Sequence, residues 1–264
     1  MAAEAQGKRT LLFGDDRSQG SDVAWLWVVS HPWPGWRVEV VTAVPGADVV
    51  EEPEPVTPPH PRSFPLGVPS PDIVHEQVVG DPPAALAALT GRDLTVVGPR
   101  GGGLGKRLRL GSVSERLLIH PPGPVLIVRH GQPTRRALVC ADGSAHAALA
   151  AQELLSMPWI DHTTVHVIVV PEDGIDPEEV GRAVAEPFAG VAADVTVIIG
   201  SPDPMDAFFS PRSVILDYVE QWDPDLLVAG TQGLSPFKSM QAGSIATLLA
   251  EQAKCSVLLA QAEV

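Results

Sequence analysis

The sequence predicts an α/β protein built from two tandem domains, each a five-stranded parallel sheet with helices on both faces. Short apolar runs alternate with helical patterns along the chain, which is typical of a parallel sheet covered by helices. The runs Leu94–Val97 and Val125–Val128 are almost continuously apolar, as strands buried on both faces should be. A search for internal repeats then divides the chain into two halves.

The two halves carry the same landmarks at a nearly constant spacing. Gly98, Gly111 and Val125 recur 132 positions later as Gly230, Gly243 and Val257, and Asp16 recurs 126 positions later as Asp142. The segments around these residues match as well, because Leu-Thr-Val-Val-Gly-Pro-Arg-Gly in the first half corresponds to Leu-Leu-Val-Ala-Gly-Thr-Gln-Gly in the second. The chain is therefore interpreted as a tandem duplication, with domains over 8–131 and 134–262.

Each half is expected to hold five strands and three or four helices. Turn signals support the boundaries; Gly80-Asp-Pro-Pro83, for example, ends a strand and begins a helix, where proline suits the first turn. In the first half the pattern predicts strands near 10–14, 37–44, 73–79, 93–98 and 125–129, and helices near 21–30, 82–90 and 112–120. In the second half it predicts strands near 136–141, 163–170, 194–200, 225–230 and 256–260, and helices near 144–156, 176–188, 211–222 and 243–253.

One segment does not fit a compact core. Residues 45–71 hold nine of the 27 prolines together with several acidic residues. This composition favours a long, solvated excursion between the second and third strands of the first half. It is either a tolerated insertion or a lid or partner-binding loop.

Composition excludes several classes of function. The formal net charge of −14 argues against sequence-independent binding of nucleic acid and against docking on an anionic membrane. No apolar run is long enough to span a bilayer, and residues 1–9 lack the apolar core of a secretion signal. The two cysteines, Cys140 and Cys255, are expected to be buried, reduced thiols of a cytoplasmic protein. Metal binding is not expected, because the one i,i+4 pair among the eight histidines, His162 and His166, lacks the context of an HExxH motif.

A glycine frame follows the fourth strand of each half. It reads Gly98-x2-Gly101-x9-Gly111-Ser112 in the first half and Gly230-x2-Gly233-x9-Gly243-Ser244 in the second. Glycines without side-chain bulk let backbone amides approach an oxyanion, and a hydroxyl residue at a helix N-terminus adds free amides and a favourable dipole. The pattern indicates a phosphate site at the carboxyl ends of the strands, where doubly wound sheets bind ligands. The alternative is that the glycines only make turns and the serines only cap helices.

These motifs resemble the universal stress protein family, in its tandem-domain, ATP-binding branch. The resemblance rests on the two glycine frames, on the strand-end Asp in Leu-Phe-Gly-Asp-Asp16-Arg-Ser, and on Gly-Pro-Val-Leu-Ile-Val-Arg129. It implies Rossmann-like domains with sheet order 3-2-1-4-5 and ATP as the ligand. It also implies that the two fifth strands pair about a pseudo-twofold axis, which would remove an exposed sheet edge. The expected assembly is thus an intramolecular pseudo-dimer of the two domains. Whether two such chains also form a homodimer is left open by the resemblance.

The resemblance assigns the site residue by residue. Asp16 and Asp142 would lie beside adenosine, Gly14 matches the glycine before that Asp, and the backbone near Val44 would read the adenine edge. The remaining predicted ligands belong to the loops and to the helices that follow them: Gly98, Arg100, Gly101, Lys106, Gly111, Ser112 and Val113 in the first half, and Gly230, Gly233, Gly243, Ser244 and Ile245 in the second.

The two predicted sites differ in charge. The first loop carries Arg100, Lys106, Arg107 and Arg109 and no acid, so it should attract an anion. Pro99 removes one amide from it. A second carboxylate, Asp15, would either repel phosphate or help to hold Mg²⁺. In the second half the counterpart of Gly14 is Cys140, and Lys238 is the one basic residue between Gly230 and Gly243. If one site is occupied, the first is favoured.

Three classes of function remain after this reading. The first is a nucleotide-binding stress or regulatory protein. The second is an enzyme that hydrolyses ATP slowly; the chain has no Gly-x4-Gly-Lys-[Ser/Thr] loop and offers no clear set of catalytic residues. The third is a nucleotide-free scaffold for dimerisation.

Overall fold

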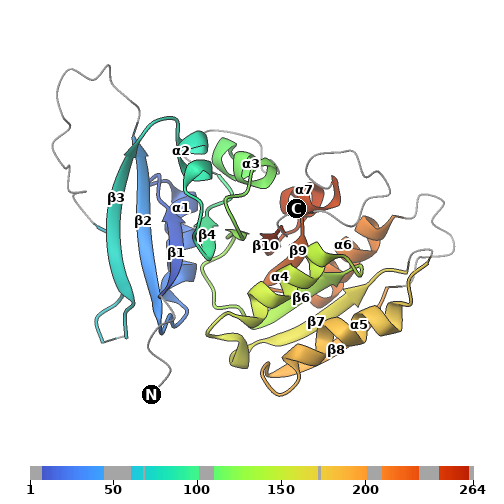
Figure 1. Cartoon of the computed structure of the whole chain (residues 1–264). Coiled ribbons are helices and arrows are strands. Elements are labelled where there is room, and N and C mark those ends of the chain that lie inside the picture. Colours follow the sequence, from blue (N-terminus) through green and yellow to red (C-terminus); the bar gives the residue numbers. More distant parts are fainter. Residues whose placement is uncertain are drawn as a thin grey trace, which may run out of the picture.

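The computed structural model describes residues 8–44, 61–67, 69–100, 110–171, 174–200, 210–231 and 244–261, the last segment with its first two residues as backbone alone. The first half contains β1 (Arg9–Gly14), α1 (Gln19–Val29), β2 (Trp36–Val44), β3 (Asp72–Val79), α2 (Pro82–Ala88), β4 (Leu94–Val97), α3 (Ser112–Ile119) and β5 (Val125–Ile127) (Figure 1). The second half contains β6 (Arg136–Ala141), α4 (Ala145–Leu155), the short 3₁₀ turn η1 (Ile160–His162), β7 (Thr164–Val169), α5 (Pro177–Ala185), the 3₁₀ turn η2 (Glu186–Phe188), β8 (Asp194–Ile199), α6 (Pro211–Trp222), β9 (Leu226–Gly230), α7 (Ser244–Gln252) and β10 (Ser256–Ala260). These elements follow the predicted ones closely.

All ten strands join in one sheet with the order β3-β2-β1-β4-β5-β10-β9-β6-β7-β8. Each half therefore has the predicted order 3-2-1-4-5. Within a half the neighbouring strands are parallel, whereas β5 and β10 pair antiparallel, with Val125 opposite Leu259 and Ile127 opposite Val257. The predicted fold class and the predicted pairing of the fifth strands are both confirmed.

The antiparallel join decides where the two halves present their strand ends. Because β5 and β10 run in opposite directions, the carboxyl ends of the first-half strands and those of the second-half strands lie at opposite borders of the shared sheet. We call the border formed by the carboxyl ends of the first-half strands the first edge, and the other border the opposite edge. The two predicted ligand sites therefore belong to opposite edges.

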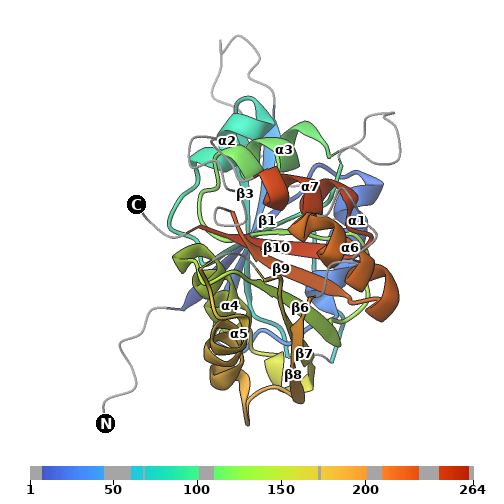
Figure 2. The same cartoon turned by 90° about the vertical axis from the view of Figure 1, so that its right-hand side faces the viewer.

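The helices cover both faces of the sheet. Helices α1, α4 and α5 pack on one face, where Trp27, Val28 and Leu154 enter the core. Helices α2, α3, α6 and α7 pack on the other, where Leu117 and Leu249 are fully buried. Figure 2 shows α4 and α5 on one side of β9 and β10 and α7 on the other. The strands β4, β9 and β10 are buried along their whole length, and for β4 the sequence predicts this.

Helix starts follow local capping rules. Ser18 and Ser144 each accept a hydrogen bond from the backbone N–H three residues on, which begins α1 and α4. Asp81, Asp176 and Ser210 cap helices that open with proline, where the missing N–H costs nothing.

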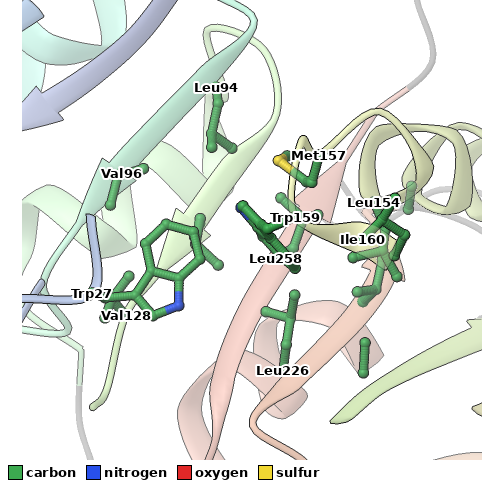
Figure 3. Close-up of a cluster of buried hydrophobic side chains, with 14 of the residues drawn as sticks. Trp27, Leu94, Val96, Val128, Leu154, Met157, Trp159, Ile160, Leu226 and Leu258 are labelled. Carbon is green, nitrogen blue, oxygen red and sulfur yellow. The ribbon is translucent and has the colours of Figure 1, made fainter. Parts of the chain in front are cut away.

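An aromatic cluster holds the two halves together beside the central strands. Trp27 of α1 meets Trp159 of the second half edge to face, with ring centroids 5.9 Å apart, and both lie near Val128 and Leu258 (Figure 3). The indole N–H of Trp27 donates to the Thr134 hydroxyl at 3.1 Å. His31, also in this cluster, accepts at Nε2 from the backbone N–H of Thr134 at 2.9 Å. The interface is thus a packed core with specific hydrogen bonds.

The Pro-rich segment differs from its prediction in the part that the structure describes. Residues 45–60 lie outside the described residues. Arg62 and Phe64, however, are half-buried against α1: the Phe64 ring lies 5.6 Å from that of Trp25, and Arg62 pairs with two aspartates. The expectation of a solvated excursion is wrong for these two residues. It missed them because composition averages over a segment, whereas one arginine and one aromatic ring suffice to anchor a chain.

Cys140 and Cys255 are free and buried, as predicted, and burial raises the pKa of both thiols, that of Cys255 to about 12. Among the described residues no helix combines the length and apolarity needed to cross a membrane.

Candidate functional site

The turns after β1 and β6 have the same architecture. Asp16 Oδ1 accepts from the Ser18 backbone N–H at 3.0 Å, and Asp142 Oδ1 accepts from the Ser144 backbone N–H at 2.9 Å. The residue between them is left-handed in both turns, with φ 59° at Arg17 and 76° at Gly143. The predicted equivalence of the two aspartates therefore extends to their backbone and hydrogen bonds. Each still offers a carboxylate oxygen at the strand end, Asp16 exposed and Asp142 half-buried.

Asp15 lies beside this turn and is fully committed to the fold. Its side chain has no exposed surface, and it accepts from Arg62 at 2.8 and 2.9 Å, from the Ser21 hydroxyl at 3.0 Å, and from the Arg17 backbone and side chain at 3.0 Å. Burial alone would raise the pKa of this carboxyl. The hydrogen bond and charge of Arg62, with those of Arg17, outweigh burial and hold the pKa below its usual value. The two alternatives that the sequence left open for Asp15 were repulsion of phosphate and a role in holding Mg²⁺. In the structure its partners are instead Arg62, Arg17 and Ser21.

The first glycine of each frame makes a close helix contact. A Cβ placed on Gly98 would lie 2.6 Å from the carbonyl carbon and oxygen of Gly20 in α1. A Cβ on Gly230 would lie 2.6 Å from the carbonyl carbon of His146 in α4. At both positions the N-terminus of a helix approaches the strand end so closely that a side chain would not fit. This packing requires glycine whether or not the loop binds a ligand.

This packing predicts the result of replacing either glycine. Gly98→Ala and Gly230→Ala should each lower the free energy of unfolding by roughly 1–3 kcal/mol, because backbone atoms must shift to admit the methyl group. Urea unfolding followed by circular dichroism measures the effect, with the exposed Ser112→Ala as a control that should change little. A loss below about 0.5 kcal/mol in both glycine variants would contradict the close contact.

The residues that follow β4 are hydrogen-bonded to the start of α3. The Gly111 N–H donates to the Pro99 carbonyl at 2.8 Å, and the Ser114 hydroxyl donates to the Gly98 carbonyl at 2.8 Å. Gly111 caps α3 without any side-chain hydrogen bond, Ser112 is exposed, and Val113 is half-buried. The structure therefore brings Gly98, Gly111, Ser112 and Val113 together and leaves the first amides of α3 without a side-chain acceptor.

The rest of the first-half prediction falls around this edge. A Cβ on Gly14 would lie 3.0 Å from Val97 of β4, and the Ser18 hydroxyl lies 3.4 Å from the Arg100 carbonyl. These contacts place Gly14, Asp16 and Arg100 at the same strand ends. The Val44 carbonyl accepts from the Gly80 N–H at 2.9 Å, so this carbonyl already has a partner in the structure. Gly101 and Lys106 lie outside the described residues.

Less of the second predicted site is described. Asp142 and Gly230 both adjoin the N-terminus of α4. Gly233 and Gly243 lie outside the described residues, and Ser244 and Ile245 are described only as the first backbone residues of α7. Cys140 fills the place that Gly14 holds in the first half and is buried there.

Arg129 is a basic residue at the first edge that the sequence analysis did not include among the predicted ligands. Arg129 follows β5, and its guanidinium donates to the Ala250 carbonyl near the end of α7, while its backbone N–H donates to the Ser256 hydroxyl at 3.1 Å. Its Nε is buried and has no partner among the described residues. Burial lowers the pKa of Arg129, and the nearby charge of Arg100 lowers it further. The signal in the sequence was a charged residue directly after a buried strand.

Metal ligands do not gather in the described part of the chain. No group of three or more His, Cys, Asp or Glu side chains there could hold an ion.

The fold defines a class, the doubly wound α/β proteins whose ligand sites lie at strand carboxyl ends. The model of the universal stress protein family matches residues 8–129 and 133–261, so this chain is a tandem member of that family.

Solved structures support the same fold. A universal stress protein from Archaeoglobus fulgidus DSM 4304 aligns over 97% of this chain and 99% of its own, with a TM-score of 0.68 and 19% identity. A putative universal stress protein from Pseudomonas aeruginosa UCBPP-PA14 covers 96% of this chain and 93% of its own, at a TM-score of 0.59 and 15% identity. The functionally unknown protein PA1789 from Pseudomonas aeruginosa PAO1 covers 96% and 92%, with a TM-score of 0.57 and 15% identity. At these identities the likeness concerns the fold.

Proposed function

We propose that this universal stress protein binds ATP at the first-half strand ends and that nucleotide occupancy serves a regulatory role in stress response. The observation that carries the proposal is the junction of β4 and α3. There the Gly98 and Pro99 carbonyls hold Ser114 and Gly111, and the first amides of α3 lack a side-chain acceptor. Free amides at a helix N-terminus favour an anion such as a phosphate group.

Charge at this edge supports the same ligand. Arg100 is close enough for its charge to act on Arg129, in a protein of net charge −14. Arg129 has no carboxylate partner among the described residues, and its Nε is buried without a hydrogen bond. An anionic group would relieve the repulsion between the two guanidiniums and offer charge-assisted hydrogen bonds. Bound ATP would supply that group as its phosphate chain.

The residues present fit a nucleotide better in the first half than in the second. In the proposed complex the exposed Asp16 accepts from ribose hydroxyls, and Ser112 and the α3 amides donate to phosphate. At the opposite edge the described residues offer Asp142, and Cys140 adds side-chain bulk where the first half has Gly14. We therefore propose one nucleotide per chain.

Arg129 also suggests how occupancy would be transmitted. Its guanidinium contacts Ala250 in α7 of the second half, whereas its backbone continues β5 of the first. An anion that draws the guanidinium toward α3 would weaken its contact with α7. The proposed ligand would thus act on a residue shared by both halves.

The proposal is tested by calorimetric titration of the full chain with Mg-ATP. Saturable binding near one equivalent is expected, and Arg129→Gln, Ser112→Ala and Asp16→Ala should each weaken it about tenfold or more, because hydrogen bonds to charged groups contribute roughly 1.5–3 kcal/mol. Gly98→Ala is unsuitable as a test, since it disturbs α1 packing. Asp142→Ala and the exposed Arg182→Gln serve as controls that should bind as the parent chain does.

Two outcomes would overturn the proposal. Absence of saturable binding by the parent chain would leave the nucleotide-free scaffold as the better reading. Binding that Asp142→Ala abolishes, and that the three first-half variants leave unchanged, would move the site to the other edge.

A further inference from the structure

A groove runs between α4 and α5 on the face opposite α6 and α7. Its volume is about 350 Å³, and its walls are mainly apolar, with Ala147, Ala148 and Ala151 from α4 and Val180, Val184 and Phe188 from α5 and η2. Small-molecule sites have volumes of roughly 300–1,000 Å³ and mostly apolar walls. We refer to this space as the α4–α5 groove; Figure 1 shows the two helices that flank it side by side.

The internal repeat identifies the counterpart of this groove in the first half. Helices α1 and α4 both have 11 residues, start after a capping serine and end before a serine. Because they lie 126 positions apart, the α4 wall residues 147, 148 and 151 correspond to Ser21, Asp22 and Trp25 of α1.

In the first half these positions are covered by the chain itself. The Arg62 guanidinium lies 2.7 Å from an Asp22 carboxylate oxygen and 3.3 Å from the Ser21 hydroxyl, and it pairs with the buried Asp15. The Phe64 ring packs edge to face against Trp25 at 5.6 Å. A cation and an aromatic ring from the connection between β2 and β3 thus cover the α1 positions that correspond to the α4 wall of the groove.

The second half lacks the three side chains that bind the Arg62 guanidinium in the first half. Ala141, Ala147 and Ala148 stand where the first half has Asp15, Ser21 and Asp22, so these three positions offer neither a carboxylate nor a hydroxyl. Ala151 stands in place of Trp25 and removes an indole ring, which leaves room for the body of a ligand. Polar side chains remain at the margins, where the exposed carboxylate of Glu179 disfavours an anion.

We propose that the α4–α5 groove binds a small, uncharged, aromatic molecule. The size of the groove and its apolar walls provide the driving force, since such a molecule would remove apolar surface from water. The aromatic character follows from the first half, where Trp25 is the counterpart of Ala151 and a phenyl ring packs against its indole. This site is separate from the proposed nucleotide site, which belongs to the other half.

The test uses N-phenyl-1-naphthylamine, a neutral aromatic fluorophore, titrated into the full chain without nucleotide. Saturable fluorescence enhancement at one equivalent is expected. Ala151→Trp, which restores the first-half residue, and Ala148→Trp, which adds an indole at an exposed wall position, should each weaken binding at least tenfold. Ala145→Trp is the matched control, because Ala145 is exposed on α4 outside the groove and should leave binding unchanged.

Circular dichroism and the thermal midpoint establish that each variant is folded, and Ala148→Trp keeps the test valid if the buried Ala151→Trp does not fold. Unsaturable partition of the dye, or equal binding by the Ala145→Trp and Ala148→Trp proteins, would overturn the proposal. So would capture of a phenylalanine-containing peptide by a chain that does not bind the dye. None of these results depends on whether ATP binds.

Discussion

Asp15→Ala should lower the free energy of unfolding by about 3 kcal/mol, because removing one partner of a buried ion pair leaves the other charge uncompensated. The Asp15 side chain has no exposed surface, and that of Arg62 is 13% exposed. The substitution also removes the acceptor of the Arg17 backbone N–H. Asp22 stays near Arg62 but is largely exposed and compensates little. Urea unfolding at pH 7 measures the change.

Two further variants separate this effect from a general loss of charge. Asp72→Ala removes an exposed pair with Arg37 and should cost less than about 1 kcal/mol. The double variant Asp15→Ala/Arg62→Leu removes both charges of the pair and should recover much of the loss, since an apolar replacement of a buried ion pair is often neutral. If Asp15→Ala unfolds with the parent's free energy, the segment around Arg62 does not anchor to α1.

Acid should weaken the junction of the two halves through His31. Burial lowers the pKa of His31 from 6.5 to about 4, and the charges of Arg135 and His130 add to this, against the Trp27 carbonyl and Asp225. Since Nε2 accepts from the Thr134 N–H, the neutral ring carries its proton on Nδ1 and donates it to the Trp27 carbonyl at 2.8 Å. Protonation of Nε2 would turn an acceptor into a donor that faces another donor.

The direction of the pH effect follows from linkage. Between about pH 6.5 and pH 4 the unfolded chain binds a proton at this histidine that the folded chain does not, so stability falls as the pH drops through this window. The contribution amounts to roughly 2 kcal/mol between pH 7 and pH 5. The stability difference between these two pH values should therefore shrink by about that amount in His31→Gln. His162→Gln, at an exposed histidine, is the control, and equal pH profiles for the parent chain and His31→Gln would contradict this role.

Much of the fold could be predicted because the signals for a parallel sheet are local and occur twice. Strands such as Leu94–Val97 are almost continuously apolar, and the same spacing of glycines and aspartates appears in both halves, so each half supports the boundaries inferred for the other. The order of strands and the pairing of β5 with β10 came from the family resemblance, since no local pattern encodes which strands become neighbours.

The candidate site was less predictable, because its decisive contacts join residues far apart in the chain. The sequence singled out Asp16 but left Asp15 with two alternatives, and the partner Arg62 lies 47 residues away in a segment whose composition suggests solvation. Arg129 meets α7 across 121 residues. The glycines at 98 and 230 show a further difficulty: close helix packing and access to phosphate both require the absence of a side chain, so the residue type alone does not separate them.

The antiparallel seam between β5 and β10 has an evolutionary consequence, because both lobes are encoded in one polypeptide. In a dimer of identical subunits every amino-acid replacement appears twice, so the two lobes must keep the same chemistry. Here each lobe can change alone while the seam stays intact. The trio Asp15, Trp25 and Arg62 in one lobe, against Ala141 and Ala151 in the other, records such divergence. One polypeptide can thereby carry two different lobes on a single pseudo-symmetric sheet.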